Sequence, residues 1–204
     1  MNEDGSMARR KDLELFAEKH SIKIGTIVDL IHYRIANERT VSRMESHMLT
    51  TKYGEFMVHK YQDSISGSIH LAYVKGKFGV DEPVLVRVHI PNTLRDICET
   101  HNKGRTSWSF NGALEQIANA GKGVAVLLSG DDYGQTLEQN FLSTFAKESD
   151  STSINRSGND LTIGTGSQIL RDIGVGKMRL LGYPARFNAI SGFDLEVVEF
   201  VKFR

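Results

Sequence analysis

The sequence predicts an α+β fold, in which helices pack on a mixed β-sheet. Short runs of β-branched and apolar residues alternate with segments whose apolar residues recur at helical spacing. The 204 residues are 40% hydrophobic and 25% charged, which is ordinary for a globular chain long enough to bury a core. Strand runs interspersed with helices favour an α+β or mixed α/β domain.

Composition also narrows the functional classes. The chain carries 25 basic and 25 acidic side chains, so no basic excess is present to bind nucleic acid through global charge. No apolar run approaches the ~20 residues needed to cross a bilayer. Cys98 is the single cysteine, which excludes an internal disulfide and a zinc site built from several thiolates of one chain. We therefore expect a cytoplasmic protein that binds neither nucleic acid nor membrane.

The first forty residues predict a small helical unit. Apolar residues at i, i+3 and i+4 indicate a helix over residues 12–20. Residues 22–24 alternate as in a short strand, and a second helix is expected from residue 26. This unit is too small to hold a core alone, so it must pack on something else.

The rest of the chain carries most of the predicted strands. Residues 40–53 are polar and suit either a linker or a first edge strand. Strand patterns follow at 55–61, 68–76, 83–90, 123–130, 177–182 and 194–203. Helices are predicted at 107–120, ended by Gly121, at 135–147, and at 166–174, ended by Gly174. Residues 148–160 carry almost no apolar side chains and predict a surface loop. The residues expected in the core include Leu114, Ile117, Ile169 and Leu180.

The N-terminal segment carries a first resemblance. "MNEDGSMAR", followed by "DLELFAEKHSIKIGTIVDLIHYR", resembles the C-terminal end of 3,4-dihydroxy-2-butanone 4-phosphate synthase of riboflavin synthesis. The resemblance covers about residues 1–39. It implies that most of that domain, with its acidic loop and metal-binding residues, precedes Met1 in a longer chain. The alternative is an N-terminal helical arm of a different domain.

The remaining segments carry a second resemblance. "GSIHLAYVKG", "PVLVRVHI", "GALEQIANAGKGVAVLL", "GTGSQILRDIGVGKMRLLG" and "GFDLEVVE" occur in the order in which GTP cyclohydrolase II has similar stretches, over about residues 55–200. The resemblance implies a cyclohydrolase-like domain over 54–204, joined by a linker at 40–53 to the synthase remnant at 1–39. Bifunctional riboflavin enzymes have the same arrangement.

The metal ligands of the resembled family are missing. The cyclohydrolase opens a purine ring with a zinc ion held by three cysteines, which lowers the pKa of a bound water. Those cysteines fall here on Asn92, Gly104 and Thr106, with Cys98 out of register. His89, Cys98, Glu99 and His101 lie within thirteen residues and form a weak alternative metal site, in which Cys98 and His101 have i, i+3 spacing. The other interpretation is a polar loop with a buried free cysteine. We expect no zinc and no other cofactor.

Other positions of the family's site are also replaced. "SGDDYGQTL" stands where the family has an arginine-containing phosphate loop, and Asp131 and Asp132 would repel phosphates. The family's Asp-x-Arg pair, thought to supply base and nucleophile, falls on Asn159 and Leu161. These substitutions leave no residue to which a catalytic role is assigned.

Two basic residues match nucleotide-contacting positions of the family. Arg87 and Arg186 are therefore the candidate nucleotide-binding residues. We expect a catalytically degenerate GTP cyclohydrolase II-like domain that serves as structural or regulatory partner of a synthase domain in the same longer chain. That parent protein would be a 3,4-dihydroxy-2-butanone 4-phosphate synthase, a lyase, and a homodimer. The alternatives are a fragment with surviving cyclohydrolase activity and a remodelled nucleotide-binding domain.

Overall fold

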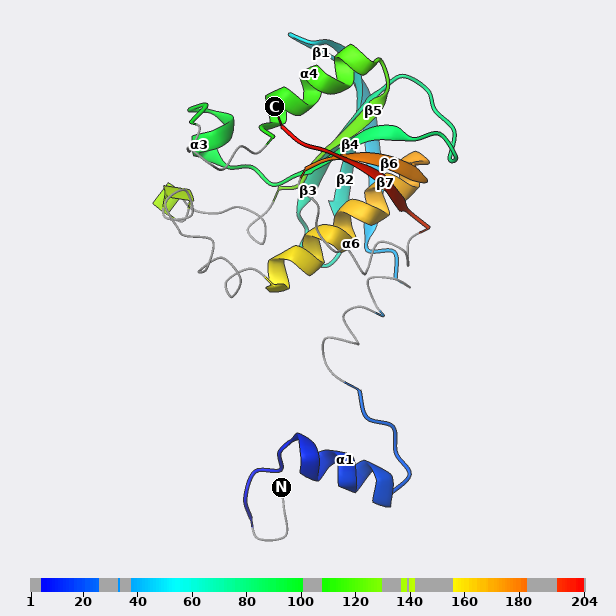
Figure 1. The fold of residues 1–204 in the computed structure, drawn as a ribbon, viewed down its shortest axis with the longest axis vertical. Coiled ribbons are helices and arrows are strands. Elements are labelled where there is room, and N and C mark those ends of the chain that lie inside the picture. The colour runs from blue at the N-terminus through cyan, green and yellow to red at the C-terminus, as the bar shows by residue number, and fades with distance from the viewer. Residues whose placement is uncertain are drawn as a thin grey trace. The chain divides into compact units, whose positions relative to one another are not determined.

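The chain forms two units, residues 1–34 and residues 35–204. A computed structural model describes residues 5–25, 33, 38–100, 108–129, 137–138, 140–141, 156–182 and 194–203, with the backbone alone for 156–162. The larger unit is a mixed β-sheet with helices on both faces (Figure 1). The α+β fold class predicted from the sequence is confirmed.

The first unit contains the helix α1, Arg10–Lys19, which confirms the helix predicted over 12–20. An ion pair of 2.8 Å between Arg10 and Glu14, one turn apart, lies along it. The strand predicted at 22–24 is wrong: these residues have no strand partner among the described part of this unit, and a strand needs a neighbouring ladder. Of the second predicted helix only Tyr33 is described, and it is helical.

The sheet of the second unit has an antiparallel and a parallel half. Among the described residues its order is β1-β2-β3-β5-β4-β6-β7. The strands are β1 Val41–Thr51, β2 Gly54–Asp63, β3 Ile69–Lys75, β4 Val84–His89, β5 Gly123–Leu127, β6 Lys177–Leu181 and β7 Glu196–Val201. Neighbours from β1 to β5 run antiparallel, whereas β5, β4, β6 and β7 run parallel. The six strand patterns expected after residue 54 are all present.

The edge of the antiparallel half is β1. Of the two alternatives for residues 40–53, a linker or an edge strand, the structure contains the edge strand, paired with β2 along its length. Its side chains are exposed or half-buried apart from Val41. Because only one neighbouring strand covers it, a polar sequence is compatible with strand structure here.

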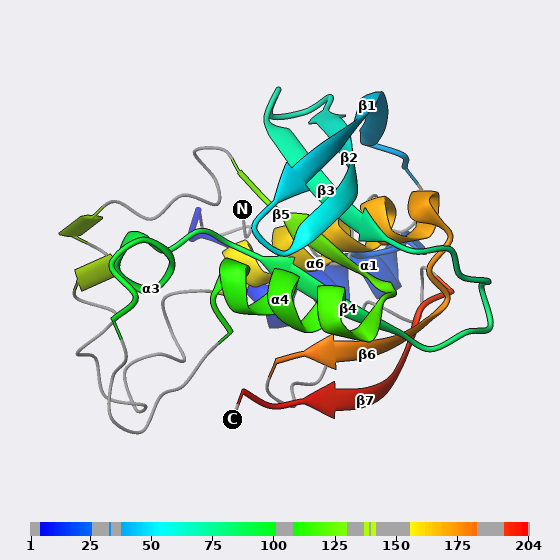
Figure 2. The ribbon, with the colours of Figure 1, turned by 90° about the horizontal axis from the view of Figure 1, so that it is seen from above.

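Alternate residues of the central strands enter two separate cores. Val84 and Val86 of β4 join one apolar cluster with α6, Arg156–Ile173, while Leu85 joins another with α4, Phe110–Ala120. Successive side chains of a strand point to opposite faces, so the two helices cover opposite sides of the sheet. Figure 2 shows α4 and α6 on either side of the central strands.

Most of the predicted core is confirmed. Leu114, Ile117 and Ile169 are at most 4% exposed. Leu180 is only partly buried, and its neighbour Leu181 is the fully buried residue of β6. α6 approaches the sheet closely, since a Cβ on Gly166 would lie 3.0 Å from Val88.

Helix ends differ from the predictions in instructive ways. α4 begins at residue 110 rather than 107, because the Ser109 side chain caps it by accepting from the Gly112 N–H. Gly121 follows it with φ 73°, the left-handed conformation expected of a C′ residue. The loop predicted over 148–160 is wrong for 156–160, which belong to α6. A polar segment can continue a helix whose packed portion has already formed, since each further residue adds a hydrogen bond.

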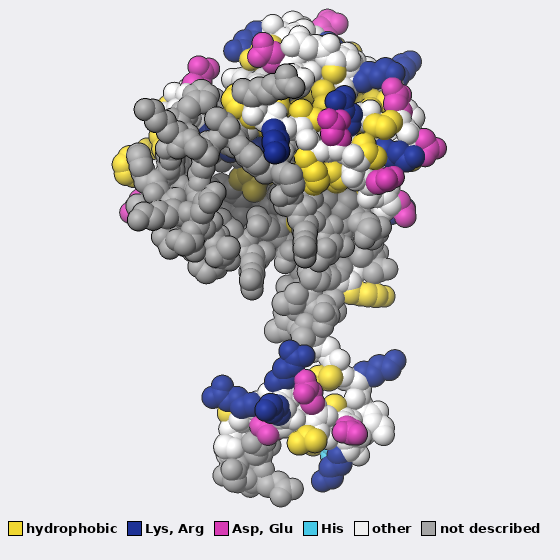
Figure 3. Space-filling view, viewed as in Figure 1, with side chains coloured by type: hydrophobic (Ala, Val, Ile, Leu, Met, Phe, Trp, Pro, Cys, Tyr) yellow, Lys and Arg dark blue, Asp and Glu magenta, His cyan; other side chains and the backbone are white. Residues whose placement is uncertain are grey.

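Two predicted segments are only partly described. Within the helix expected over 135–147, residues 137, 138, 140 and 141 are helical, and the others lie outside the described residues, as do 148–155 of the predicted loop. No helix in the described part of the chain is both long and apolar enough to span a membrane. On the face drawn in Figure 3, basic and acidic side chains of the described residues are intermixed, in keeping with the net charge of zero.

Candidate functional site

A buried polar network lies where the parallel strands β4 and β5 end. Ligand sites of open sheets with parallel strands form at such carboxyl ends. β4 ends at His89, which pairs with Leu127 of β5, and the short helix α3, Thr93–Asp96, follows. Asn92, the residue expected at the first lost cysteine position, precedes α3 directly. This is therefore the place to test for a metal or catalytic site.

His89 and Asp96 form the centre of this network. The His89 side chain is fully buried, and its Nε2 lies 2.8 Å from Oδ2 of Asp96. Nδ1 of the same ring accepts from Nε of Arg87 at 3.3 Å, which assigns the proton to Nε2. Burial lowers the pKa of His89 to about 4, so the imidazole is neutral near pH ~7.

The Asp96 carboxylate accepts from several donors at once. Arg95 Nε donates to Oδ1 at 3.1 Å, and the backbone N–H groups of Asn92 and Phe110 donate at 2.8 and 3.0 Å. Burial alone raises the pKa of Asp96, but the hydrogen bonds from His89 and Arg95 outweigh it and hold that pKa well below its usual range. The carboxylate is thus an ionised anchor whose acceptor sites are occupied.

Arg87, a candidate nucleotide-binding residue, is held by the protein itself. Its Nη1 donates to the carbonyl of Leu181 at 2.8 Å and its Nη2 to the carbonyl of Trp108 at 3.3 Å. With the bond to His89, all three guanidinium nitrogens have protein acceptors. Burial, with the nearby charge of Arg95, lowers the pKa of Arg87 to about 10. Arg87 therefore ties β4 to β6 and to the segment before α4.

Asn92 serves as the N-cap of α3. Its Oδ1 accepts from the Arg95 N–H at 3.0 Å, and its Nδ2 donates to Oδ1 of Asn140, which is 1% exposed. Capping by asparagine satisfies one of the free N–H groups at a helix start. Both ends of the Asn92 amide are therefore occupied.

The other predicted site residues are less fully described. Cys98 is exposed, so the interpretation of a buried free cysteine is wrong; the short α3 ends before it. For Asn159 and Leu161 only the backbone is described, within α6. The predicted site residues outside the described part of the chain are His101, Gly104, Thr106, Asp131, Asp132 and Arg186.

The described residues do not fit the zinc ion that the resembled family holds. Among them no group of three His, Cys, Asp or Glu side chains is arranged to hold a metal. Asn92 offers an amide at the position where the resemblance implies a thiolate, and that amide is already hydrogen-bonded at both its oxygen and its nitrogen. His89 likewise has both ring nitrogens engaged. No chemical step through zinc is derived for this site.

Sequence reasoning missed the members of the network other than Arg87, His89 and Asn92. Asp96, Arg95 and Asn140 were not singled out, although Asn92 followed by Arg95 and Asp96 has the spacing of a capped helical turn. This local spacing could have identified Arg95 and Asp96 from the sequence. The contact between Asn92 and Asn140 could not be predicted in this way, because 48 residues separate the two asparagines.

A second polar cluster, which we call the β1 clamp, fastens the edge strand to α6. Asp172 accepts from Tyr61 Oη at 2.8 Å and from Arg43 Nε at 2.9 Å, and it pairs with Arg39. Burial raises the pKa of Asp172, but the hydrogen bonds from Tyr61 and Arg43 lower it further than burial raises it. The clamp consists of Arg39, Arg43, Tyr61, Gln168 and Asp172, with Gln168 Oε1 accepting the Thr40 and Val41 N–H groups.

The chain is similar in sequence to proteins of riboflavin biosynthesis. Residues 42–202 match the family described as GTP cyclohydrolase II. The chain is 49% identical over 205 residues to a Pseudomonas aeruginosa protein named 3,4-dihydroxy-2-butanone 4-phosphate synthase, covering 98% of this chain and 54% of that protein. It is 39% identical to the riboflavin biosynthesis protein RibBA of Aquifex aeolicus, covering 98% of this chain and 51% of that one.

A solved structure resembles the whole chain. The crystal structure of RibBX, a two-domain 3,4-dihydroxy-2-butanone 4-phosphate synthase from A. baumannii, matches with a TM-score of 0.68 and 42% identity. The match covers 100% of this chain and 52% of the other. The chain therefore spans about half the length of the relatives it matches.

Proposed function

The chain belongs to the GTP cyclohydrolase II family, and from that premise we propose that it is a catalytically degenerate domain of a riboflavin-biosynthesis protein. In this proposal it acts as the structural or regulatory partner of a 3,4-dihydroxy-2-butanone 4-phosphate synthase domain in the same longer chain. It needs no zinc, and it works as part of a homodimer.

One observation carries the proposal: the network around Asn92, His89 and Asp96 is saturated. Hydrolytic ring opening needs an activated water, supplied by a metal or by a general base. Nδ1 of His89 already accepts from Arg87, and Nε2 already donates to Asp96, so this imidazole has no lone pair available for a water proton. Asn92 caps a helix where the family has a metal thiolate. Histidine and aspartate side chains are catalytic in many enzymes, but in this network His89 and Asp96 hold the loop before α4 in place.

The relatives support the choice of partner. The P. aeruginosa and A. baumannii proteins are named for the synthase reaction, and this chain matches only about half of each. The other half is then the part that would carry the named activity. A domain without chemistry of its own can still regulate its neighbour, provided that it contacts two states of that neighbour differently.

The alternatives have less support. Surviving cyclohydrolase activity would have to proceed without the family's cysteine ligands, and nucleotide binding rests on Arg87 and Arg186. Every guanidinium nitrogen of Arg87 donates to a protein acceptor, and Arg186 lies outside the described residues. Neither alternative is therefore offered as a second candidate function.

The absence of catalysis is tested by incubating the chain with GTP, zinc and magnesium. We expect no release of formate or pyrophosphate above buffer, while an active cyclohydrolase in the same assay releases both. Turnover abolished by Arg87→Gln would contradict the proposal, since it would mean that the polar network does chemistry.

The partner role is tested on the longer protein, with and without residues 42–204. We expect deletion to change the rate of 3,4-dihydroxy-2-butanone 4-phosphate formation, the thermal midpoint of the synthase domain, or both. A changed midpoint with an unchanged kcat indicates a structural role, and a changed kcat at an unchanged midpoint indicates a regulatory one. A synthase that is unaltered in both properties would refute the partner role.

A further inference from the structure

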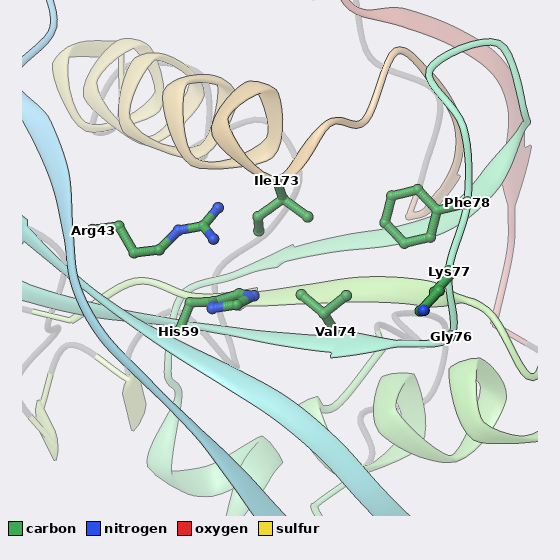
Figure 4. A pocket seen from close by; sticks show the side chains of 7 residues that line it. All are labelled: Arg43, His59, Val74, Gly76, Lys77, Phe78 and Ile173. Atoms are coloured by element: carbon green, nitrogen blue, oxygen red, sulfur yellow. The ribbon is translucent and has the colours of Figure 1, made fainter.

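A pocket of about 340 Å³ lies beside β1, β2, β3 and the last turn of α6 (Figure 4). It lies on the opposite face of the sheet from the network around His89: Val74 packs against the cluster under α6, whereas Phe110, which contacts His89, packs against the cluster under α4. Val74, which lines the pocket, pairs with Val124 near the start of β5, whereas His89 pairs with Leu127 at its end. The volume is within the range of about 300–1,000 Å³ that small-molecule sites occupy. The pocket is thus separate from the site already described.

Three nitrogen donors border this pocket without a protein acceptor. Arg43 uses Nε and Nη2 on Tyr61 and Asp172, and its Nη1 makes no hydrogen bond within the described residues. Ser46 Oγ lies 2.6 Å from Nδ1 of His59, and in the tautomer in which the Ser46 hydroxyl donates to Nδ1 the ring proton is on Nε2, which has no acceptor in the same part of the chain. Lys77 forms no ion pair there. Donors that border one cavity without protein acceptors favour the binding of an anion, and Arg43 and His59 lie together at one end of it.

The charges near the pocket leave a positive excess. Asp172 contacts both Arg39 and Arg43, so two guanidinium groups share this one carboxylate. Lys77 adds a further positive charge on the other side of the cavity. An anionic ligand would therefore meet net attraction without displacing the β1 clamp.

The rest of the lining is apolar. Figure 4 shows Arg43 and His59 at one end, Lys77 and Phe78 at the other, and Val74 and Ile173 between them. All three apolar side chains are half-buried and pack against the core cluster under α6. A ligand that fits this lining carries an anionic group at one end and an apolar body that spans the middle.

We propose that this pocket binds a small organic phosphate. The phosphate accepts from Arg43 Nη1 and His59 Nε2, and a ring-bearing body lies between Val74, Ile173 and Phe78. Lys77 contributes its charge from the far end. This function goes beyond the proposed partner role and does not depend on it, since ligand binding is measured on this chain alone.

The test uses phenyl phosphate as the probe, titrated into the chain and followed by calorimetry and by ¹H–¹⁵N NMR. We expect saturable binding with chemical-shift changes at His59, Val74 and Lys77. Phenol and inorganic phosphate should each bind at least about tenfold more weakly, because each lacks one half of the recognised chemistry. Equal binding by phenol would overturn the assignment of the anion site, and no saturable binding by phenyl phosphate would overturn the proposal.

Matched variants locate the site. His59→Phe removes the Nε2 donor but keeps a ring, and it should raise the dissociation constant about tenfold. Lys77→Met should raise it about threefold, since the lysine is exposed. Lys202→Met, at an exposed lysine near the C-terminus, should leave it unchanged. Thermal midpoints verify that each variant is folded. Equal affinities for Lys77→Met, His59→Phe and Lys202→Met would overturn the proposal.

Discussion

The fully buried imidazole of His89 donates a 2.8 Å hydrogen bond to Asp96, seven residues later in the chain. The bond closes the segment between β4 and α3 into a compact loop. Arg95 and two backbone N–H groups complete the coordination of the same carboxylate. A loop held in this way does not depend on a metal ion for its conformation.

Removal of the Asp96 carboxylate should destabilise the fold strongly. Asp96→Ala leaves the buried donors of His89 and Arg95 without their acceptor, and we expect a loss of about 3–5 kcal/mol in the free energy of unfolding. Urea unfolding at neutral pH measures this loss. The control is Asp81→Ala, whose carboxylate is 96% exposed and should matter by less than about 0.5 kcal/mol. Equal losses for the two variants would refute the role given to Asp96.

Acidification should destabilise the protein through His89. Its folded-state pKa is about 4, below the usual ~6.5, so between these pH values the unfolded chain binds a proton that the folded protein does not. Stability should therefore fall by up to about 3 kcal/mol as pH drops from ~6.5 to ~4. The depressed pKa of Asp96 continues the loss below that window.

His89→Gln tests the assignment of this pH dependence. We expect the variant to have a shallower slope of unfolding free energy against pH, since one buried neutral imidazole is gone. His47→Gln changes a histidine that is 68% exposed and should keep the wild-type slope. A His89→Gln protein with the full wild-type slope would mean that other groups, such as His59 or His70, carry it; burial lowers the pKa of both.

The hydroxyl of Tyr61 should contribute measurably to the β1 clamp. Tyr61→Phe removes a hydrogen bond to the Asp172 carboxylate and an acceptor for Arg43, so we expect a loss of about 1.5–3 kcal/mol. Tyr73→Phe is the matched control, because the Tyr73 hydroxyl has no hydrogen bond within the described residues. Its change should stay below about 0.5 kcal/mol. Thermal or urea unfolding compares the two, and a larger effect at Tyr73 would disprove the clamp.

Adjacent leucines of β6 should differ in their contributions. Leu181 is fully buried, and Leu181→Ala should cost about 2–5 kcal/mol. Leu180 is only partly buried, so Leu180→Ala should cost about half as much, since less apolar area is lost. Urea unfolding of the two variants gives both values. A reversed order would show that the alternation of β6 between the two cores is misassigned.

Purified protein should contain no stoichiometric zinc. The resemblance to the cyclohydrolase implies that its three ligand positions fall on Asn92, Gly104 and Thr106, which supply no thiolate. Elemental analysis measures the metal content, and alkylation of exposed Cys98 provides a second readout. Equimolar zinc should not slow this alkylation. One zinc per chain, or protection of Cys98 by zinc, would contradict the prediction.

The sheet was predictable because its signals are local. The β-branched run at Val84–His89 is typical of a strand, and the apolar residues Leu114 and Ile117 have helical spacing. Both patterns are visible within a short stretch of sequence. Residues 41–51 were ambiguous because this local signal is weak there. An edge strand with one neighbouring strand carries too few apolar residues to be distinguished from a linker.

The polar contacts were harder to predict because they join distant segments. Asn92 contacts Asn140 across 48 residues, and Arg43 contacts Asp172 across 129. Nothing near either residue indicates its partner. The resemblance to the cyclohydrolase implies a cysteine position at Asn92, but only the geometry explains what the asparagine does: it caps α3.

During synthesis of the chain, the β1 clamp can form only after α6 has left the ribosome. Arg43 leaves the ribosome 129 residues before Asp172, and at ~5–20 residues per second this interval lasts about 6–26 s. During that time the β1–β2 hairpin exists without the helix that later covers Val41 and Tyr61. The hairpin's apolar face is then available to chaperones and to other nascent chains.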